Sequence, residues 1–169
     1  RKHLPVSVAI SVGLVLFFYF GPVLFEMTGK DGHKADPNRR VLGHDLVAEE
    51  FEKIRSAQPD SGDLFLVALG HRDIASHLAF GLPDQPRLYR WESSGTIVSQ
   101  YEMWNNPEED GLVGKDALIL APEMDKLPGR FARAFRKVEK LDEFTVRFGY
   151  DRERTFSVFR ASGLKSWPD

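Results

Sequence analysis

Four side chains in this sequence have the chemistry to contact a ligand. Gln100, Tyr101 and Trp104 lie in one short segment, and amphipathic aromatic rings beside an amide suit either a sugar or a membrane interface. The alternative is that both rings share one face of a helix and pack in the core. Arg72 follows an apolar strand, on the side of an α/β sheet where ligands usually bind. Its guanidinium would bind an anionic group there; the alternative is that Arg72 is an ordinary surface or capping residue.

Familiar catalytic patterns do not occur in the sequence. The glycines of Gly111–Lys115 lie three rather than five residues apart, and Asp116 follows where a phosphate-binding loop has Ser or Thr. The five histidines show neither the i, i+4 spacing of a zinc pair nor an H-E-x-x-H motif. There is no G-x-S-x-G turn and no cysteine. We therefore expect no catalytic residue, metal ligand or cofactor within this chain.

A long uncharged segment precedes these residues. Leu4–Phe25 has 22 residues without Asp, Glu, Lys or Arg, about 33 Å as a helix and enough to cross a hydrocarbon core of about 30 Å. It exceeds the roughly 7–15 apolar residues of a cleaved signal peptide, so we predict a transmembrane helix over residues 1–26. Arg1 and Lys2 precede this segment and Glu26 follows it. The charges place the N-terminus in the cytoplasm and the bulk of the chain outside the inner (plasma) membrane.

The rest of the chain is weakly acidic. Residues 26–169 hold all 25 Asp and Glu residues and all but two of the 23 Lys and Arg residues, so no excess of positive charge favours nucleic acid. Hydrophobic residues make up 42% of the chain and aromatic residues 12%, enough to fill a core. We expect a folded domain whose partners include the lipid bilayer but no nucleic acid.

Apolar patterning predicts the elements that position the candidate residues. A polar stretch over 27–40 predicts a linker, and residues 41–169 predict one extracytoplasmic domain. Within this domain we expect helices over 41–58 and 72–81, strands over 64–69, 87–91 and 117–121, a short interrupted helix over 123–134, and long strands over 135–148 and 155–161. This order predicts an α/β fold, a mostly parallel sandwich closed by a C-terminal antiparallel hairpin.

Three short motifs, in this order, resemble a known family. They are Ala79–Pro86 leading into Arg87–Tyr89, then Ser99–Trp104, then Gly114–Ile119. They are similar to segments in the C-terminal soluble region of bacterial GT-C glycosyltransferases of family 39, the dolichyl-phosphate-mannose mannosyltransferase-like enzymes, which resemble the lipid A aminoarabinose and galacturonic acid transferases. The resemblance covers about Val41 to Ala121, with the apolar segment before it.

The chain departs from the family pattern at several positions. Gly81 stands where the family has Tyr, Asp84 where it has Gly, and Ser99 where it has Asn. The segment from His71 to Asp73 reads His-Arg-Asp where the family often has Asp-Arg-Tyr. The catalytic Asp of the family lies in its first extracytoplasmic loop, and no such loop occurs in this chain.

The resemblance implies that the chain is the last transmembrane helix and periplasmic domain of a multi-pass enzyme. Such enzymes transfer a sugar from a polyprenyl-phosphate carrier to an envelope lipid, glycan or protein, using an acidic general base and, in some relatives, a divalent metal. The partners would be the remaining transmembrane core and the polyprenyl-phosphate sugar donor. The domain would cap the catalytic cavity, with Arg72, Gln100, Tyr101 and Trp104 as candidate substrate-binding residues.

Two other interpretations stay open. The first is a single-pass, membrane-anchored binding or scaffold domain without enzymatic activity. The second is a small α/β module that binds a nucleotide or a sugar.

Overall fold

The computed structural model describes residues 3–168. The elements, in chain order, are α1 (Leu4–Met27), α2 (His44–Ser56), β1 (Phe65–Leu69), α3 (Arg72–Gly81), β2 (Leu88–Trp91), a 3-10 turn η1 (Gln100–Glu102), β3 (Ala117–Pro122), α4 (Gly129–Ala132), β4 (Phe135–Arg147) and β5 (Glu153–Leu164). The chain forms two compact units, Arg1–Gly43 with Arg147–Glu153, and His44–Val146 with Arg154–Asp169.

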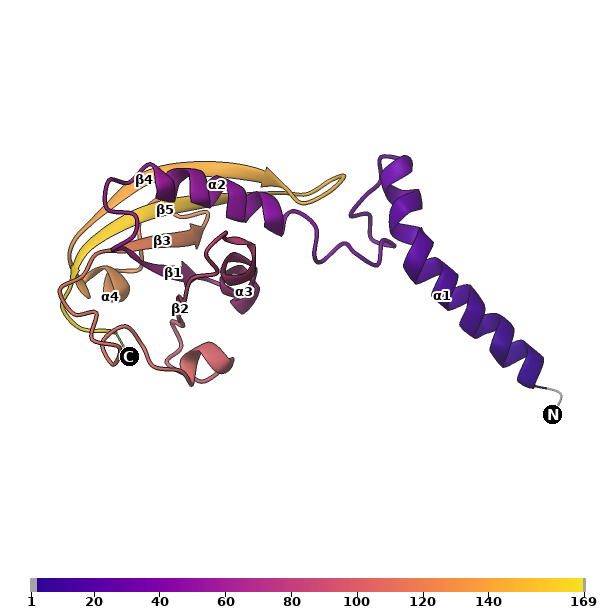
Figure 1. Ribbon diagram of the computed structural model, residues 1–169, viewed down its shortest axis with the longest axis horizontal. Coiled ribbons are helices and arrows are strands. Elements are labelled where there is room, and N and C mark those ends of the chain that lie inside the picture. The colour runs from indigo at the N-terminus through magenta and orange to yellow at the C-terminus, as the bar shows by residue number, and fades with distance from the viewer. Residues whose placement is uncertain (1–2, 169) are drawn as a thin grey trace. The chain divides into compact units, whose positions relative to one another are not determined.

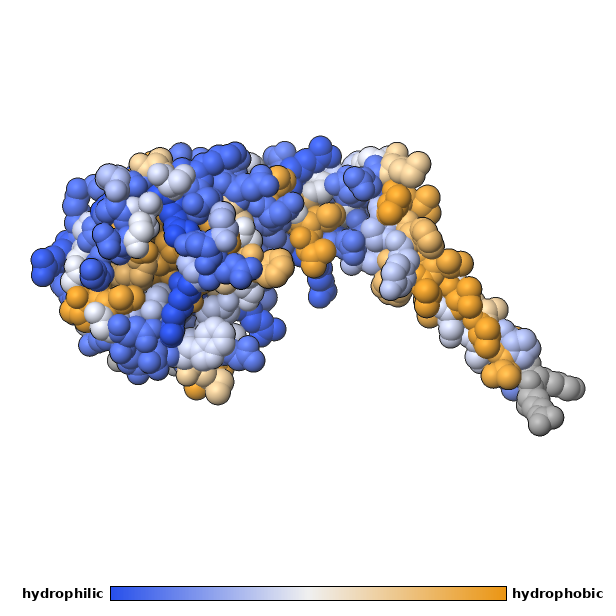
Figure 2. All heavy atoms as spheres, in the orientation of Figure 1, coloured by the Kyte–Doolittle hydropathy of each residue, from blue (hydrophilic) through white to orange (hydrophobic). Residues whose placement is uncertain are grey.

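The helix α1 dominates the first unit. Its 24 residues have a mean hydropathy of 2.3 over the most apolar window, and apolar side chains cover its exposed surface (Figure 2). By length and composition it can cross a membrane, although a signal sequence near an N-terminus meets the same criteria. The hydroxyl of Thr28 donates to the Leu24 carbonyl at 2.8 Å and so satisfies one of the free carbonyls at the helix end.

The polar stretch after α1 is a series of hydrogen-bonded turns. Asp36 is buried, and its carboxylate accepts from the backbone N–H groups of Gly32 at 2.7 Å and Asn38 at 2.8 Å. The tip of the β4–β5 hairpin packs against these turns, where the N–H of Tyr150 donates to the Asp31 carbonyl at 2.6 Å. The segment predicted as a linker therefore has a defined backbone path.

The sheet belongs to the second unit and has the order β2-β1-β3-β5-β4 (Figure 1). The strand β1 runs parallel to both β2 and β3, with Val67 opposite Tyr89 on one side and Ile119 on the other. β3 pairs antiparallel with β5, placing Ile119 opposite Phe159. The predicted fold class is confirmed: three parallel strands are extended by a C-terminal antiparallel hairpin.

Helices cover both faces of the sheet. The amphipathic helices α2 and α3 pack on each other, and α3 packs on β1 and β2. Val67, Tyr89 and Ile119 share the opposite face, where they join an apolar cluster with Phe131 of α4. The strand β2 forms one edge of the sheet.

The helix predicted from residue 41 begins at His44 instead. Gly43 has φ +80°, and a Cβ there would lie 2.9 Å from the Arg147 carbonyl oxygen and 3.0 Å from the Phe148 ring. The close backbone contact with the hairpin tip keeps residues 41–43 in turns. Apolar spacing alone does not reveal such a contact.

Gly149 at the hairpin tip provides a test of this packing. It has φ +104°, and a Cβ would lie 2.6 Å from the Asp31 carbonyl oxygen. We expect Gly149→Ala to lower the free energy of local unfolding at the hairpin tip by about 1–3 kcal/mol. Faster hydrogen exchange over residues 28–43 and 147–153 would measure this loss. Gly29→Ala is the control, because Gly29 has φ +65° but nothing within 4 Å of a Cβ. Equal exchange in the two variants would contradict the packing described.

Candidate functional site

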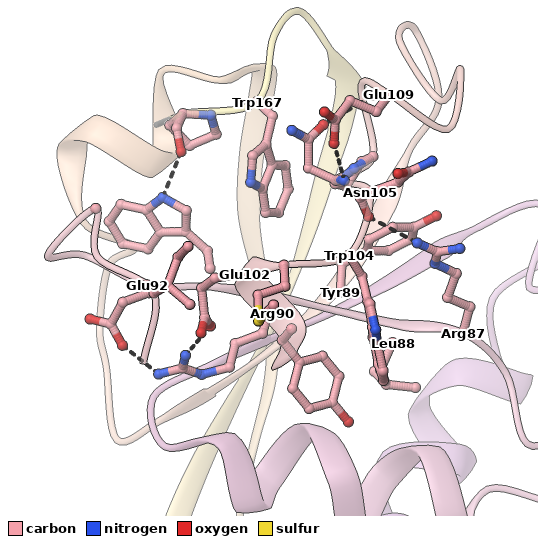
Figure 3. A pocket seen from close by; sticks show the side chains of 18 of the residues that line it. Arg87, Leu88, Tyr89, Arg90, Glu92, Glu102, Trp104, Asn105, Glu109 and Trp167 are labelled. Atoms are coloured by element: carbon pink, nitrogen blue, oxygen red, sulfur yellow. Dashed lines mark hydrogen bonds and ion pairs between the residues drawn. The ribbon is translucent and has the colours of Figure 1, made fainter. Parts of the chain in front are cut away.

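A cavity of about 300 Å³ lies beside the edge strand β2. Its walls come from β2, from the segment that contains η1, and from the C-terminal residues Trp167 and Pro168 (Figure 3). A volume of this size lies at the lower end of the roughly 300–1,000 Å³ typical of small-molecule sites. Residues between 87 and 109 and the distant C-terminal residues 167 and 168 therefore meet at one concave surface.

A buried arginine holds the wall of this cavity together. The side chain of Arg90 is 5% exposed, and its two terminal nitrogens pair with the carboxylates of Glu92 and Glu102. Figure 3 shows the guanidinium between the two acids. Its Nε donates to the Gly70 carbonyl at 3.0 Å, at the end of β1. Because a guanidinium has five N–H donors, it can join two loops and a strand end at once.

Glu102 connects this arginine to η1. Its carboxylate accepts from the Ser99 backbone N–H at 2.6 Å and from the Ser99 hydroxyl at 2.8 Å, while the Ser99 hydroxyl accepts from the Tyr101 N–H. These are the contacts of a capping box, in which the first and last residues of a turn satisfy each other. The next residues of the chain, including Trp104, are held in position by this turn.

Both acids are held in their ionised form. Burial raises the pKa of the Glu102 carboxyl, but hydrogen bonds from Ser99 and Arg90 outweigh it, and the pKa lies below its ordinary value. Burial likewise raises the pKa of Glu92, and hydrogen bonds from Ser94 and Arg90 bring it below the ordinary value. The cluster therefore carries one positive and two negative charges at neutral pH.

A second polar cluster fixes the far side of the cavity. Asp110 accepts from the Tyr89 hydroxyl at 2.7 Å and from the Asn105 amide at 3.0 Å, and it pairs with Arg87 at 3.0 Å. The Arg87 guanidinium lies 5.1 Å from the Tyr89 ring centre. Burial, with the hydrogen bond to Asp110, raises the pKa of Tyr89 to about 12, so its hydroxyl stays a donor. This cluster orients Asn105 next to the aromatic wall.

Aromatic rings form the rest of the lining. Trp104 is 54% exposed and meets Tyr101 edge to face, with ring centres 5.2 Å apart. Trp167 is half-buried and packs on Phe131 at 5.6 Å. The Trp91 indole donates to the Pro168 carbonyl at 3.0 Å and holds the C-terminal residues against the site. Exposed ring faces beside amide and carboxylate groups can stack on the apolar face of a ring-shaped ligand and bind its hydroxyls.

The four residues expected from the sequence do not all meet. Tyr101 and Trp104 line the cavity. Gln100 is exposed and is not among the lining residues; its backbone carbonyl accepts from the N–H of Trp104 at 3.2 Å. Arg72 also lies outside the lining, where its guanidinium donates to the Val98 carbonyl at 3.3 Å. Arg72 is therefore placed to hold the loop that precedes η1.

Sequence reasoning missed the residues that build the site. Arg90 interrupts an apolar strand, and a buried arginine needs acidic partners. The spacing of Ser99 and Glu102 is that of a capping box. Both signals could have been found. Trp167 carries no such signal, because only the tertiary fold brings it to β2.

Among residues 3–168, no group of three or more His, Cys, Asp or Glu side chains is arranged to hold a metal ion. Comparison with protein-family models, curated proteins and solved structures gives no match.

Removal of the Arg90 guanidinium should destabilise the loop between Glu92 and Glu102. We expect Arg90→Met to leave two partly buried carboxylates without a cation and to cost about 3–5 kcal/mol of stability, measured by thermal or urea unfolding. Lys137→Met is the control, since the Lys137–Glu139 pair is exposed on both sides and surface pairs contribute little. Similar stability losses in the two variants would argue against a structural role for Arg90.

The lowered pKa of Glu102 predicts a loss of stability in acid. Its stabilising effect is complete above the ordinary value of 4.5 and is lost as the pH falls through the lower pKa of the folded state. We expect the melting temperature to fall as the pH drops below about 4.5, and to fall less steeply in Glu102→Gln. The stability difference between the two proteins should be largest near neutral pH. A difference that grows in acid would contradict this assignment.

Proposed function

We propose that this chain is the C-terminal anchor and extracytoplasmic domain of an integral-membrane glycosyltransferase. The enzyme would transfer a sugar from a polyprenyl-phosphate carrier to an envelope lipid, glycan or protein, and the cavity beside β2 would bind part of a sugar substrate. The observation that carries the proposal is the composition of the cavity, in which the exposed Trp104 ring and the half-buried Tyr101 and Trp167 rings lie beside Asn, Glu and Arg groups. Sugars present apolar C–H faces to such rings and hydroxyls to such polar groups.

The family-like motifs support the proposal because two of them border this cavity. The first leads into β2 and contributes Arg87, Leu88 and Tyr89 to the lining. The second contains Tyr101 and Trp104. The third has a different role: Asp116 accepts from Arg160 at 2.9 Å and from the Gly163 N–H at 2.9 Å, and so ties the start of β3 to β5.

The helix α1 would be the membrane anchor. Its apolar surface and length suit a bilayer, and the basic residues before it put the N-terminus in the cytoplasm. The second unit then lies on the periplasmic side of the inner membrane, where a polyprenyl-linked sugar and an envelope acceptor are both accessible.

The chain would contribute substrate binding rather than bond formation. The general base would come from the remaining transmembrane core of the parent protein. A divalent metal, where relatives use one, does not fit the described residues, which lack a suitable set of ligands. The role of this domain is to cap the catalytic cavity and to hold a sugar in a fixed orientation, which lowers the entropic cost of transfer.

Trp104 provides a test of the binding role. We expect Trp104→Ala to lower sugar transfer by about tenfold or more, with little change in melting temperature because the side chain is half-exposed. Trp104→Phe keeps an aromatic face and should retain most of the transfer. The assay follows a labelled sugar from its polyprenyl-phosphate carrier in membranes that contain the native protein. A stability loss that accounts for the loss of transfer would mean that the ring serves packing instead.

The mass of the native protein separates this proposal from a single-pass binding domain. An antibody against residues 41–169 should detect an integral-membrane species far above 19.2 kDa. A species close to that mass would exclude the transferase, because the catalytic core would be missing.

A further inference from the structure

A second cavity continues from the first at Trp104. It has a volume of about 500 Å³ and is lined by Arg87, Met103, Trp104 and Asn105, all of which also line the first cavity. The two cavities therefore adjoin at these four residues, of which Trp104 is the only aromatic one. We call the first cavity the inner cavity and the second, lined by these four residues, the outer shelf. A ligand of one ring in the inner cavity would leave the outer shelf empty.

The outer shelf has the same chemistry as the inner cavity. Met103 and Trp104 are 70% and 54% exposed, so both present apolar surface to a ligand on the outer shelf. Arg87 and Asn105 supply polar groups at its border. Apolar faces repeated along a groove, with amide and guanidinium groups beside them, suit a chain of sugar rings better than one ring.

The charges at both cavities are already paired. Arg90 is neutralised by Glu92 and Glu102, and Arg87 pairs with Asp110. These two are the only cationic side chains that line either cavity among the described residues. A phosphate or uronate group would find no unpaired cation here and would face the carboxylates of Glu92 and Glu109. The electrostatics therefore favour an uncharged ligand.

We propose that the two cavities form one groove for the acceptor, an uncharged glycan of at least two sugar units, and not for the phosphate-linked donor sugar. This inference rests on the proposed function and specifies which substrate the domain holds. The inner cavity would hold one sugar unit between Trp167 and Tyr101, and Trp104 would support the next unit on the outer shelf.

Chain-length dependence of binding tests the groove. The full chain is inserted in lipid nanodiscs, and calorimetry with saturation-transfer NMR measures affinity for mannose, mannobiose and mannotriose, and for N-acetylglucosamine, its dimer and its trimer. In at least one series we expect affinity to rise about tenfold from one to two units. Trp104→Ala should remove this gain, while Phe80→Ala should keep it, because Phe80 is exposed but lines neither cavity. Equal affinity for one and two units would overturn the inference and leave the proposed function standing.

Sugar phosphates test the charge argument. Mannose 1-phosphate and N-acetylglucosamine 1-phosphate should bind the wild-type chain no more tightly than the free sugars. Asp110→Asn keeps an acceptor for the Tyr89 hydroxyl but releases Arg87 from its ion pair, so it should raise the affinity for the sugar phosphates several-fold relative to the affinity of the same variant for the free sugars. Tighter binding of the phosphates by the wild type would reverse the assignment to acceptor. Absence of binding by every sugar, charged or neutral, would overturn both the inference and the proposed function.

Discussion

The buried guanidinium of Arg90 is the constraint on which the site depends. It lies on an edge strand, where the backbone has no further strand to pair with on one side. Its side chain pairs with Glu92 and Glu102, which lie on either side of the loop that follows β2. The loop is thus closed by electrostatics rather than by apolar packing, which leaves Ile97, Met103 and Trp104 exposed and available to a ligand.

The sequence was a good guide to the elements and a poorer guide to the site. The helix over 72–81 and the strands near 64–69 and 117–121 were predictable because continuous apolar runs and glycine breaks mark buried elements. The start of α2 was not predictable, because the contact between Gly43 and the hairpin tip determines where this helix begins. Of the site, the aromatic pair was visible as a local motif. The position of Trp167 depends on the whole sheet, and no local pattern encodes it.

Gly81, Asp84 and Ser99, at which the sequence differs from the glycosyltransferase motifs that it resembles, each have a local structural role. At Gly81 a Cβ would lie 2.8 Å from the Ala48 methyl, so the close approach of α2 and α3 leaves no room for Tyr. Asp84 accepts two hydrogen bonds from Arg55, at 2.8 Å and 2.6 Å, and ties the end of α3 to α2. Ser99 caps η1. All three residues therefore act in holding neighbouring elements together.

The hairpin tip has a consequence for how the domain can be isolated. Residues 147–153 belong to the same unit as the turns after α1, so the chain passes between the two units three times. A soluble fragment that begins at residue 41 would keep the tip but remove Asp31 and Gly32, the backbone on which Gly149 and Tyr150 rest. A fragment that begins at Thr28 would retain those partners. The useful boundary for expression thus lies at the end of α1, ahead of the first residue of the α/β pattern.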